Sequence, residues 1–91
     1  AGAVLLDCPV SGTGAQAAAG DLVVFVSGDE AAAGRLRPVL APLARDIRHV
    51  GPFGHGMKLK LVANLLVTIH NLSTAEALNF ARQAGLDLRM V

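Results

Sequence analysis

The hydrophobic residues of this chain form short continuous runs in its first half and one long helical pattern in its second half. Short apolar runs bounded by glycine, proline or aspartate are typical of buried strands, whereas a long run without proline is typical of a helix. We expect strands over residues 3–10, 22–28 and 47–50, a helix over residues 30–43 and a long helix over residues 57–84. Strands that alternate with helices indicate the α/β class.

Proline and glycine mark the ends of several of these elements. Pro9 restricts the first strand to an edge or a bulge, because proline cannot donate to the ladder. Pro38 and Pro42 fall within the helix expected over residues 30–43 and predict that it is kinked or split. Gly85 follows the long helix and is expected to end it as the C′ residue.

The long helix is apolar on nearly every side. Taking Lys60 as zero, Asn64 lies at about 40°, Asn71 at about 20° and Thr68 at about 80° around the axis, so the polar residues form one narrow stripe. A helix of this kind is built to be buried on several sides, and Lys60 must then reach water, a cleft or a charged partner. The alternative is that the stripe faces solvent and that Lys60 is a solvated surface charge.

The spacing Gly54-x-Gly56-x-x-x-Lys60-x-x-x-Asn64 joins the third expected strand to this helix. The two glycines allow a tight turn with positive φ. Lys60 and Asn64 lie one helical turn apart on the same face. Together they could hold one substrate hydroxyl from two sides, with the lysine as general acid or base and the asparagine as the orienting group.

Two other glycine motifs match known phosphate-binding patterns only in part. Gly12-x-Gly14-x-x-Ala17 has the form of the dinucleotide fingerprint, but only residues 15–21 separate it from the next strand. A crossover between parallel strands needs about a dozen residues, so this loop is expected to join antiparallel or neighbouring strands. A stand-alone nucleotide site on this loop is the weaker alternative. Residues 51–58 nearly match a P-loop, but the lysine comes one residue late and no Ser or Thr follows it.

Composition excludes several classes of function. The net charge is +1, aromatic residues make up 3% of the chain, and no basic block is present, so nucleic-acid binding is not expected. The three histidines are scattered, without a carboxylate at ligand spacing, so no metal site is expected. Cys8 is the single cysteine, which rules out an internal disulfide; a small buried thiol fits it better than a nucleophile.

Cellular location and chain length follow from the same features. The apolar stretch after Met57 is interrupted by polar residues, so no membrane span is expected, and residues 1–6 do not read as a signal peptide. We therefore expect a cytoplasmic protein. Ninety-one residues allow one small domain or part of a larger one, and the chain begins in a strand pattern without Met. We expect it to be a fragment.

Two motifs in this order resemble the β-hydroxyacid dehydrogenase family, which includes 3-hydroxyisobutyrate, tartronate semialdehyde and 6-phosphogluconate dehydrogenases. Residues 7–13, with the sequence DCPVSGT, look like the substrate-binding loop of that family, which usually ends in Ser-Gly-Gly. Residues 54–64 look like its catalytic segment. The resemblance covers essentially the whole chain. Thr13 stands where the family usually has glycine, which adds a hydroxyl and a Cβ to the loop.

The resemblance implies roles for individual residues. Lys60 would be the general acid/base, and Asn64 would bind the substrate near the reacting oxygen. The loop residues Ser11, Gly12 and Thr13 would hold the substrate carboxylate through backbone and hydroxyl donors. The cofactor would be NAD or NADP, but no residue of this chain is expected to bind it, because the family's glycine fingerprint is absent here.

The resemblance also implies an architecture. Residues 1–52 would be the C-terminal portion of a Rossmann-like NAD(P)-binding domain, and residues 53–91 the catalytic turn, a long interdomain helix and the start of a helical domain. The complete enzyme would transfer a hydride between nicotinamide and a small hydroxyacid or semialdehyde, and the isolated chain would be inactive. We expect a homo-oligomer formed through the long helix. The alternative function is a non-catalytic helical assembly module, in which Lys60 is a solvated charge.

Overall fold

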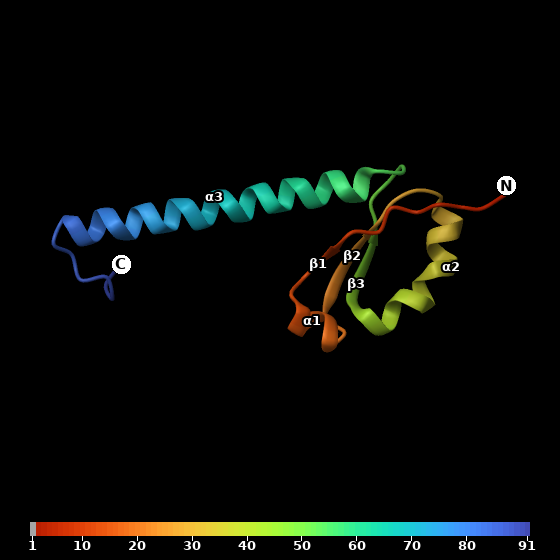
Figure 1. The fold of residues 1–91 in the computed structure, drawn as a ribbon, viewed down its shortest axis with the longest axis horizontal. Coiled ribbons are helices and arrows are strands. Elements are labelled where there is room, and N and C mark those ends of the chain that lie inside the picture. Colours follow the sequence, from red (N-terminus) through yellow and green to blue (C-terminus); the bar gives the residue numbers. More distant parts are fainter. Residues whose placement is uncertain (1) are drawn as a thin grey trace. The chain divides into compact units, whose positions relative to one another are not determined.

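The computed structural model describes residues 2–91, which form two compact units. The first unit extends to Leu61, and the second comprises Val62–Val91. The first contains β1 (Val10–Ser11), α1 (Gly14–Ala18), β2 (Leu22–Val26), α2 (Glu30–Leu40), a 3₁₀ turn η1 (Ala41–Leu43), β3 (Ala44–His49) and the start of α3 (His55–Gln83). The α/β class is therefore confirmed (Figure 1). The division at residues 52 and 53 concerns functional domains and stays a prediction.

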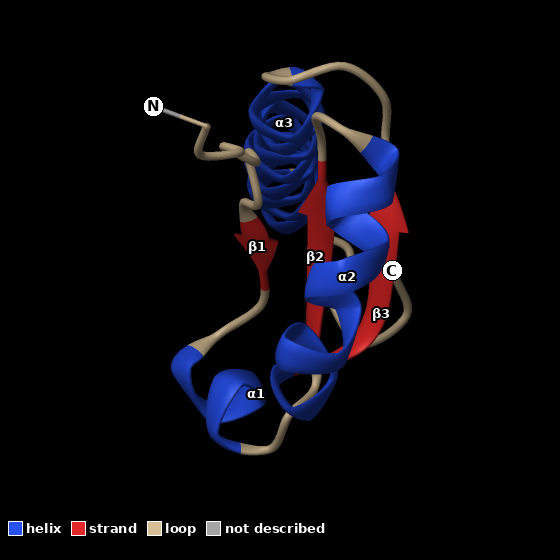
Figure 2. Cartoon of the chain, turned by 90° about the vertical axis from the view of Figure 1, so that its right-hand side faces the viewer, coloured by secondary structure: helices blue, strands red, loops and turns tan. Residues whose placement is uncertain are grey.

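The sheet of the first unit has the order β1-β2-β3. β1 pairs antiparallel with β2, with Val10 opposite Val24, and β2 pairs parallel with β3. The helix α2 connects β2 to β3 and lies across one face of these two strands (Figure 2). The loop after β1 thus joins antiparallel neighbours, as its shortness predicts, and it contains no parallel crossover.

The core lies between the sheet and α2. Burial alternates along β2, and its buried residues Val24 and Val26 pack with Ile47 of β3 and Ala33 of α2. Small alanines on α2 let the helix approach the sheet closely, which suits a chain with few aromatic residues. Val39, which the helical pattern places inward, is 67% exposed instead, because the buried face of α2 runs along its alanines.

Capping and proline explain the bounds of α2. The Asp29 carboxylate accepts a hydrogen bond of 2.7 Å from the Ala32 backbone N–H, so Asp29 is the N-cap. Pro38 lies inside the helix and Pro42 inside the following 3₁₀ turn, so the predicted split is confirmed. The Arg37 guanidinium donates to the Ile47 carbonyl at 2.8 Å and so ties the helix to β3.

The first predicted strand is wrong in extent. Only Val10 and Ser11 form a regular strand, although Asp7 makes an isolated antiparallel bridge with Ser27. Pro9 interrupts the ladder between them, because it has no N–H to donate. Its carbonyl still accepts from the Phe25 N–H at 3.0 Å, so the extended segment stays attached to β2. Residues expected to form a turn after it fold into the five-residue helix α1.

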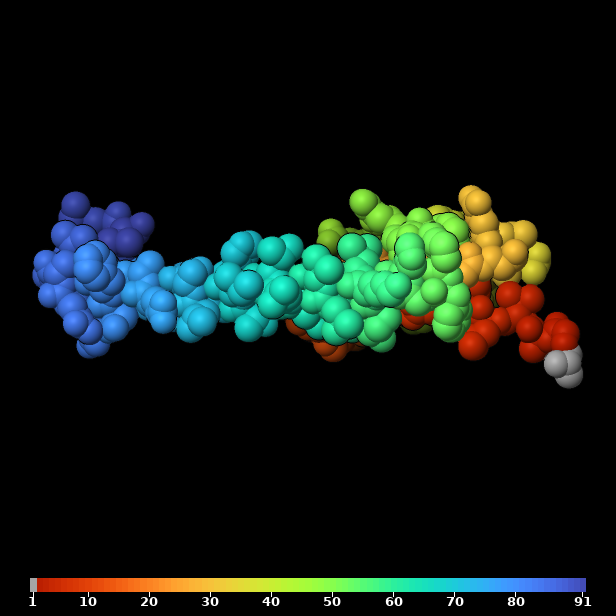
Figure 3. Space-filling view, turned by 90° about the horizontal axis from the view of Figure 1, so that it is seen from above, coloured from red at the N-terminus to blue at the C-terminus, as the bar shows by residue number. Residues whose placement is uncertain are grey.

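The long helix α3 ends as predicted. Gly85 has φ +78°, and its N–H donates to the Arg82 carbonyl at 3.2 Å while the Leu86 N–H donates to the Ala81 carbonyl at 3.0 Å. This pair of bonds is a Schellman motif. The residues after Gly85 turn back beside the end of the helix within the second unit and leave Ala81 only 4% exposed (Figure 3).

The remaining apolar side chains of α3 in the second unit are largely exposed. Leu65 and Leu72 are each 60% exposed, and Val67 and Ile69 are more than half exposed. Across residues 2–91, none of the helices is both long and apolar enough to span a membrane.

Candidate functional site

The predicted substrate loop lies at the end of β1. Ser11 is the last residue of that strand, Gly12 follows with φ +147°, and Thr13 is the N-cap of α1. A Cβ at Gly12 would lie 2.5 Å from the Leu22 Cδ2 atom and would also require a backbone conformation that other residues rarely adopt. The loop therefore needs glycine at this position.

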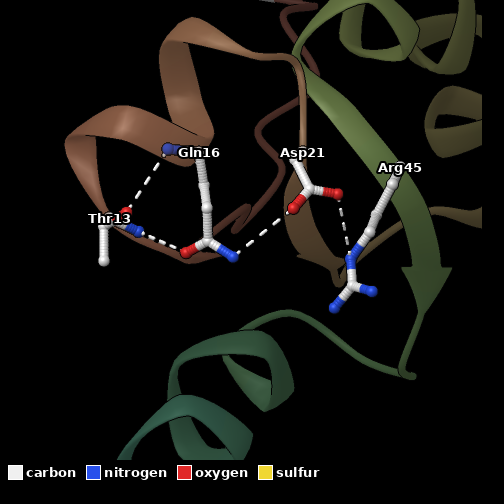
Figure 4. A network of polar contacts seen from close by, with 4 residues as sticks. All are labelled: Thr13, Gln16, Asp21 and Arg45. Carbon is white, nitrogen blue, oxygen red and sulfur yellow. Dashed lines mark hydrogen bonds and ion pairs between the residues drawn. The ribbon is translucent and has the colours of Figure 1, made fainter.

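Thr13 and Gln16 form a capping box at the start of α1. The Gln16 N–H donates to the Thr13 hydroxyl at 3.3 Å, and the Thr13 N–H donates to the Gln16 side-chain oxygen at 2.8 Å. The Gln16 amide nitrogen in turn donates to Asp21 at 3.5 Å, and Asp21 faces Arg45 of β3 at 3.5 Å (Figure 4). The Thr13 backbone N–H, a predicted carboxylate donor, is thus engaged within the loop, while its hydroxyl still has a proton to donate.

Lys60 lies far from this loop in the sequence but contacts the residue just before it. It lies in the first part of α3, its residue is half-buried, and its Nζ donates a 2.7 Å hydrogen bond to the Val10 carbonyl. Val10 directly precedes Ser11, so the two motifs found in the sequence meet within the first unit although fifty residues separate them. An ammonium group has three donors, and one bond to Val10 leaves two for another oxygen.

Asn64 belongs to the second unit. Its side chain is exposed, and its backbone carbonyl accepts a 2.9 Å hydrogen bond from the Thr68 hydroxyl. Thr68, on the same polar stripe, is therefore occupied with the helix backbone.

The structure also shows two polar residues to which the motifs assign no role, Asp7 and Ser27. Ser27 is 0% exposed, and its hydroxyl donates to the Asp7 carboxylate at 2.9 Å while accepting from the Gly56 N–H at 2.9 Å. The same Asp7 oxygen, Oδ2, accepts from the Met57 N–H at 2.9 Å. Asp7 and Ser27 thus cap the start of α3 from distant parts of the chain.

The two glycines before Lys60 have different roles. Gly54 has φ +89° and open space around it, as expected for a turn. Gly56 lies inside α3 and has no positive φ, so the expectation of a turn conformation is wrong for this residue. A Cβ there would lie 2.7 Å from the Phe25 carbonyl oxygen, so glycine is required because the helix approaches β2 closely.

Cys8 is half-buried next to this cap. Burial raises the pKa of its thiol, and the neighbouring Asp7 charge raises it further. A raised thiol pKa disfavours the reactive thiolate, which fits a packing residue. Residues 2–91 contain no group of three or more His, Cys, Asp and Glu arranged to hold a metal ion.

The Gly12–Ala17 segment lacks the form of a dinucleotide cradle. The helix after Gly12 has only five residues, and the Thr13 and Gln16 amides are already bonded within the capping box. The fingerprint that binds a pyrophosphate needs free amides at the start of a longer helix that packs between parallel strands. The expectation that this chain supplies no cofactor-binding residue stays a prediction.

Comparison with known proteins places this site in a family. Residues 1–51 match the NAD binding domain of 6-phosphogluconate dehydrogenase. That match covers more than half of the chain and includes the substrate loop. The chain belongs to the β-hydroxyacid dehydrogenase family. The predicted family, the α/β class and the cofactor type, NAD or NADP, are thereby confirmed.

Individual members of the β-hydroxyacid dehydrogenase family are similar over nearly the whole chain. It is 41% identical over 86 residues to L-threonate dehydrogenase of Pectobacterium atrosepticum, covering 93% of this chain and 28% of that protein. It is 39% identical over 90 residues to NAD-dependent L-serine dehydrogenase of Pseudomonas aeruginosa, covering 99% of this chain and 30% of that protein. The 3-hydroxyisobutyrate dehydrogenase of Mycobacterium tuberculosis, solved with L-serine, matches with a TM-score of 0.87 and 41% identity over 90% of this chain and 28% of its own.

A further solved relative supports the cofactor type. Psf3 in complex with NADP+ and 2-OPP matches with a TM-score of 0.76 and 34% identity, over 93% of this chain and 30% of its own. The chain thus spans less than a third of the length of each of these relatives.

Proposed function

We propose that residues 1–91 carry the proton-transfer group and the substrate loop of an NAD(P)-dependent hydroxyacid dehydrogenase. The observation that carries this proposal is the 2.7 Å hydrogen bond from Lys60 Nζ to the Val10 carbonyl, at the entrance to the Ser11–Thr13 loop. The bond leaves the ammonium group two donors near the loop, which supports binding of a small molecule with a hydroxyl and a carboxylate. Membership of the dehydrogenase family supports the same reaction class.

The chemistry assigned to this segment is proton movement. Oxidation of a hydroxyl to a carbonyl removes a hydride from carbon and a proton from oxygen. NAD(P), when bound to the complete enzyme, would supply the acceptor for that hydride. Lys60 takes the hydroxyl proton as a neutral amine and returns it in the reverse reaction as an ammonium. The roles of Ser11, Gly12 and Thr13 in binding the carboxylate, and of Asn64 in binding near the reacting oxygen, are those that the family resemblance implies.

The substitution Lys60→Ala in the complete enzyme tests this role. General acid–base catalysis typically supplies about 10²–10⁴-fold, so we expect kcat to fall by at least about 100-fold. Lys58→Ala is the matched control, because Lys58 is an exposed lysine on the same helix turned well away from Lys60. A loss of less than about tenfold for Lys60→Ala would refute the proposal.

We further propose that the long helix α3 mediates homo-oligomer formation. The support is the exposure of its apolar side chains in the second unit, where Leu65 is 60% and Leu66 52% exposed. Contiguous exposed apolar surface of this kind marks an interaction site. Sedimentation of the 91-residue chain should show self-association that Leu65→Asp abolishes. If only this second proposal held, Lys60→Ala would leave every measured property unchanged, and the chain would be an assembly module.

A further inference from the structure

We propose that Asp7 and Ser27 are positioning residues for Lys60, because together they fix the first turn of α3 against the substrate segment. We call the two side chains the Asp7–Ser27 cap. The inference deepens the proposed function and rests on it, since it concerns where the proton-transferring amine is held. It assigns a role in the reaction to Ser27, which lies outside both motifs, and to Asp7, the first residue of the substrate-loop motif, which had no role of its own there.

The cap completes the hydrogen bonding at the start of α3. The first backbone N–H groups of a helix have no partner within the helix. Here the His55 N–H donates to Pro52 and the Lys58 N–H to Gly54, at 3.1 and 3.2 Å. The two amides between them, of Gly56 and Met57, donate to Ser27 Oγ and Asp7 Oδ2, both at 2.9 Å. All four amides are satisfied, two of them only by the cap.

The cap is rigid because its members also bind each other. The fully buried Ser27 hydroxyl donates to Asp7 Oδ2 at 2.9 Å, and the backbones of the two residues form an antiparallel bridge. A carboxylate at this place also interacts favourably with the positive end of the helix dipole. Gly56 permits the close approach, since a Cβ there would lie 3.0 Å from Asp7 Oδ2 and closer still to Phe25.

The geometry links the cap to the lysine. Lys60 lies one helical turn after Gly56, so any shift of the capped turn moves the Lys60 backbone by the same amount. Its Nζ is held at the other end by the Val10 carbonyl, three residues beyond Asp7. The extended segment 7–13 therefore holds the start of the helix, anchors the amine and continues as the substrate loop. Misplacement of a catalytic group by about 1 Å can lower the rate about 100-fold.

A double-mutant cycle in the complete enzyme tests this coupling. We expect Asp7→Ala to lower kcat by about 10-fold to 100-fold, since it removes the cap without touching Lys60. Asp7→Asn should recover most of kcat, because the amide oxygen can still accept from Ser27 and Met57. In the Lys60→Ala background, Asp7→Ala should change kcat by less than about twofold, since residues that act through one another are non-additive.

Asp29→Ala is the matched control. It also removes an aspartate that caps a helix, but α2 rather than α3, and so should leave kcat unchanged. If Asp7→Ala does not fold, Ser27→Ala replaces it in the same cycle, because it leaves the Gly56 N–H without its partner.

The outcomes separate the two proposals. If Lys60→Ala impairs turnover but Asp7→Ala and Ser27→Ala do not, the positioning role is wrong and the proposed function stands. If removal of the cap lowers kcat by the same factor with and without Lys60, the cap has only a structural role and the inference is also wrong. If Lys60→Ala leaves kcat within about tenfold, the proposed function itself fails.

Discussion

Replacing Gly56 by alanine tests how closely α3 approaches the sheet. The added Cβ would lie 2.7 Å from the Phe25 carbonyl oxygen and 2.9 Å from Pro9 Cδ. Real Cβ atoms essentially never come within 3.0 Å of a non-bonded heavy atom. A strand carbonyl and a proline ring also cannot rotate away as the end of a flexible side chain can. We therefore expect the first turn of α3 to move away from β2.

Two destabilising effects and one stabilising effect set the size of the change in the free energy of unfolding. Overpacking in a well-packed site costs about 1–3 kcal/mol. The movement also lengthens the bonds from Gly56 and Met57 to the Asp7–Ser27 cap, each contributing about 1 kcal/mol. Against this, alanine is more favourable than glycine in a helix by at most about 1 kcal/mol. With overpacking at about 2 kcal/mol, about half of the energy of the two bonds lost and about 1 kcal/mol regained, the expected net loss in the free energy of unfolding is about 2 kcal/mol.

Gly34→Ala provides the matched control. Gly34 is also a helical glycine, but a Cβ there would have no atom within 4 Å, so alanine should stabilise the chain by about 0.5–1 kcal/mol. Urea unfolding followed by far-UV circular dichroism suits a chain without Trp or Tyr, and amide exchange in β2 reports on the first unit separately. Equal stability of the Gly56→Ala and Gly34→Ala variants would refute the packing argument.

Three other predictions concern the loop, the thiol and the cofactor. Gln16→Ala removes the side chain that accepts a hydrogen bond from the Thr13 N–H. In steady-state assays of the complete enzyme, KM for the hydroxyacid should rise about fivefold with kcat little changed. An unchanged KM would argue against a binding role for the loop. Burial and Asp7 raise the pKa of Cys8, so the folded chain should favour the protonated thiol and lose stability as the pH rises from the ordinary thiol pKa through this raised value. Iodoacetamide should accordingly alkylate Cys8 more slowly in the folded than in the urea-unfolded chain at pH 8, and equal rates would contradict the burial argument. Calorimetric titration of the 91-residue chain with NADH and NADPH should show no binding up to millimolar ligand, and saturable binding would mean that the Gly12 loop forms a nucleotide site after all.

Elements set by local signals were predictable from the sequence. The apolar run of β2 by itself predicted a buried strand. Gly85 ends α3 because only glycine readily adopts its positive φ. The change from α2 to the 3₁₀ turn at Pro42 has an equally local reason, since proline removes a backbone donor, whereas α2 continues past Pro38. Lys60 also stood out locally, because it is a cation on a helix that is apolar on nearly every side.

Features that depend on distant contacts could not be predicted in the same way. The Asp7–Ser27 cap joins three segments, and nothing near Asp7 in the sequence reveals that its oxygen will meet the Met57 N–H fifty residues later. The role of Gly56 was mistaken for the same reason, because the Phe25 carbonyl that excludes a Cβ comes from another strand. The first strand was predicted too long because its apolar residues gave no sign of where pairing with β2 would stop.

The segment from Asp7 to Thr13 bonds both to the start of α3 and to the Lys60 amine, and this has a consequence for recombination among related enzymes. A crossover placed between residues 13 and 55 would combine a loop from one parent with a helix start from another, and would separate residues that bond to each other. A library that inherits both stretches from the same parent should yield more active chimaeras than one cut between them. The two stretches are distant along the gene, but they should be exchanged together in recombination.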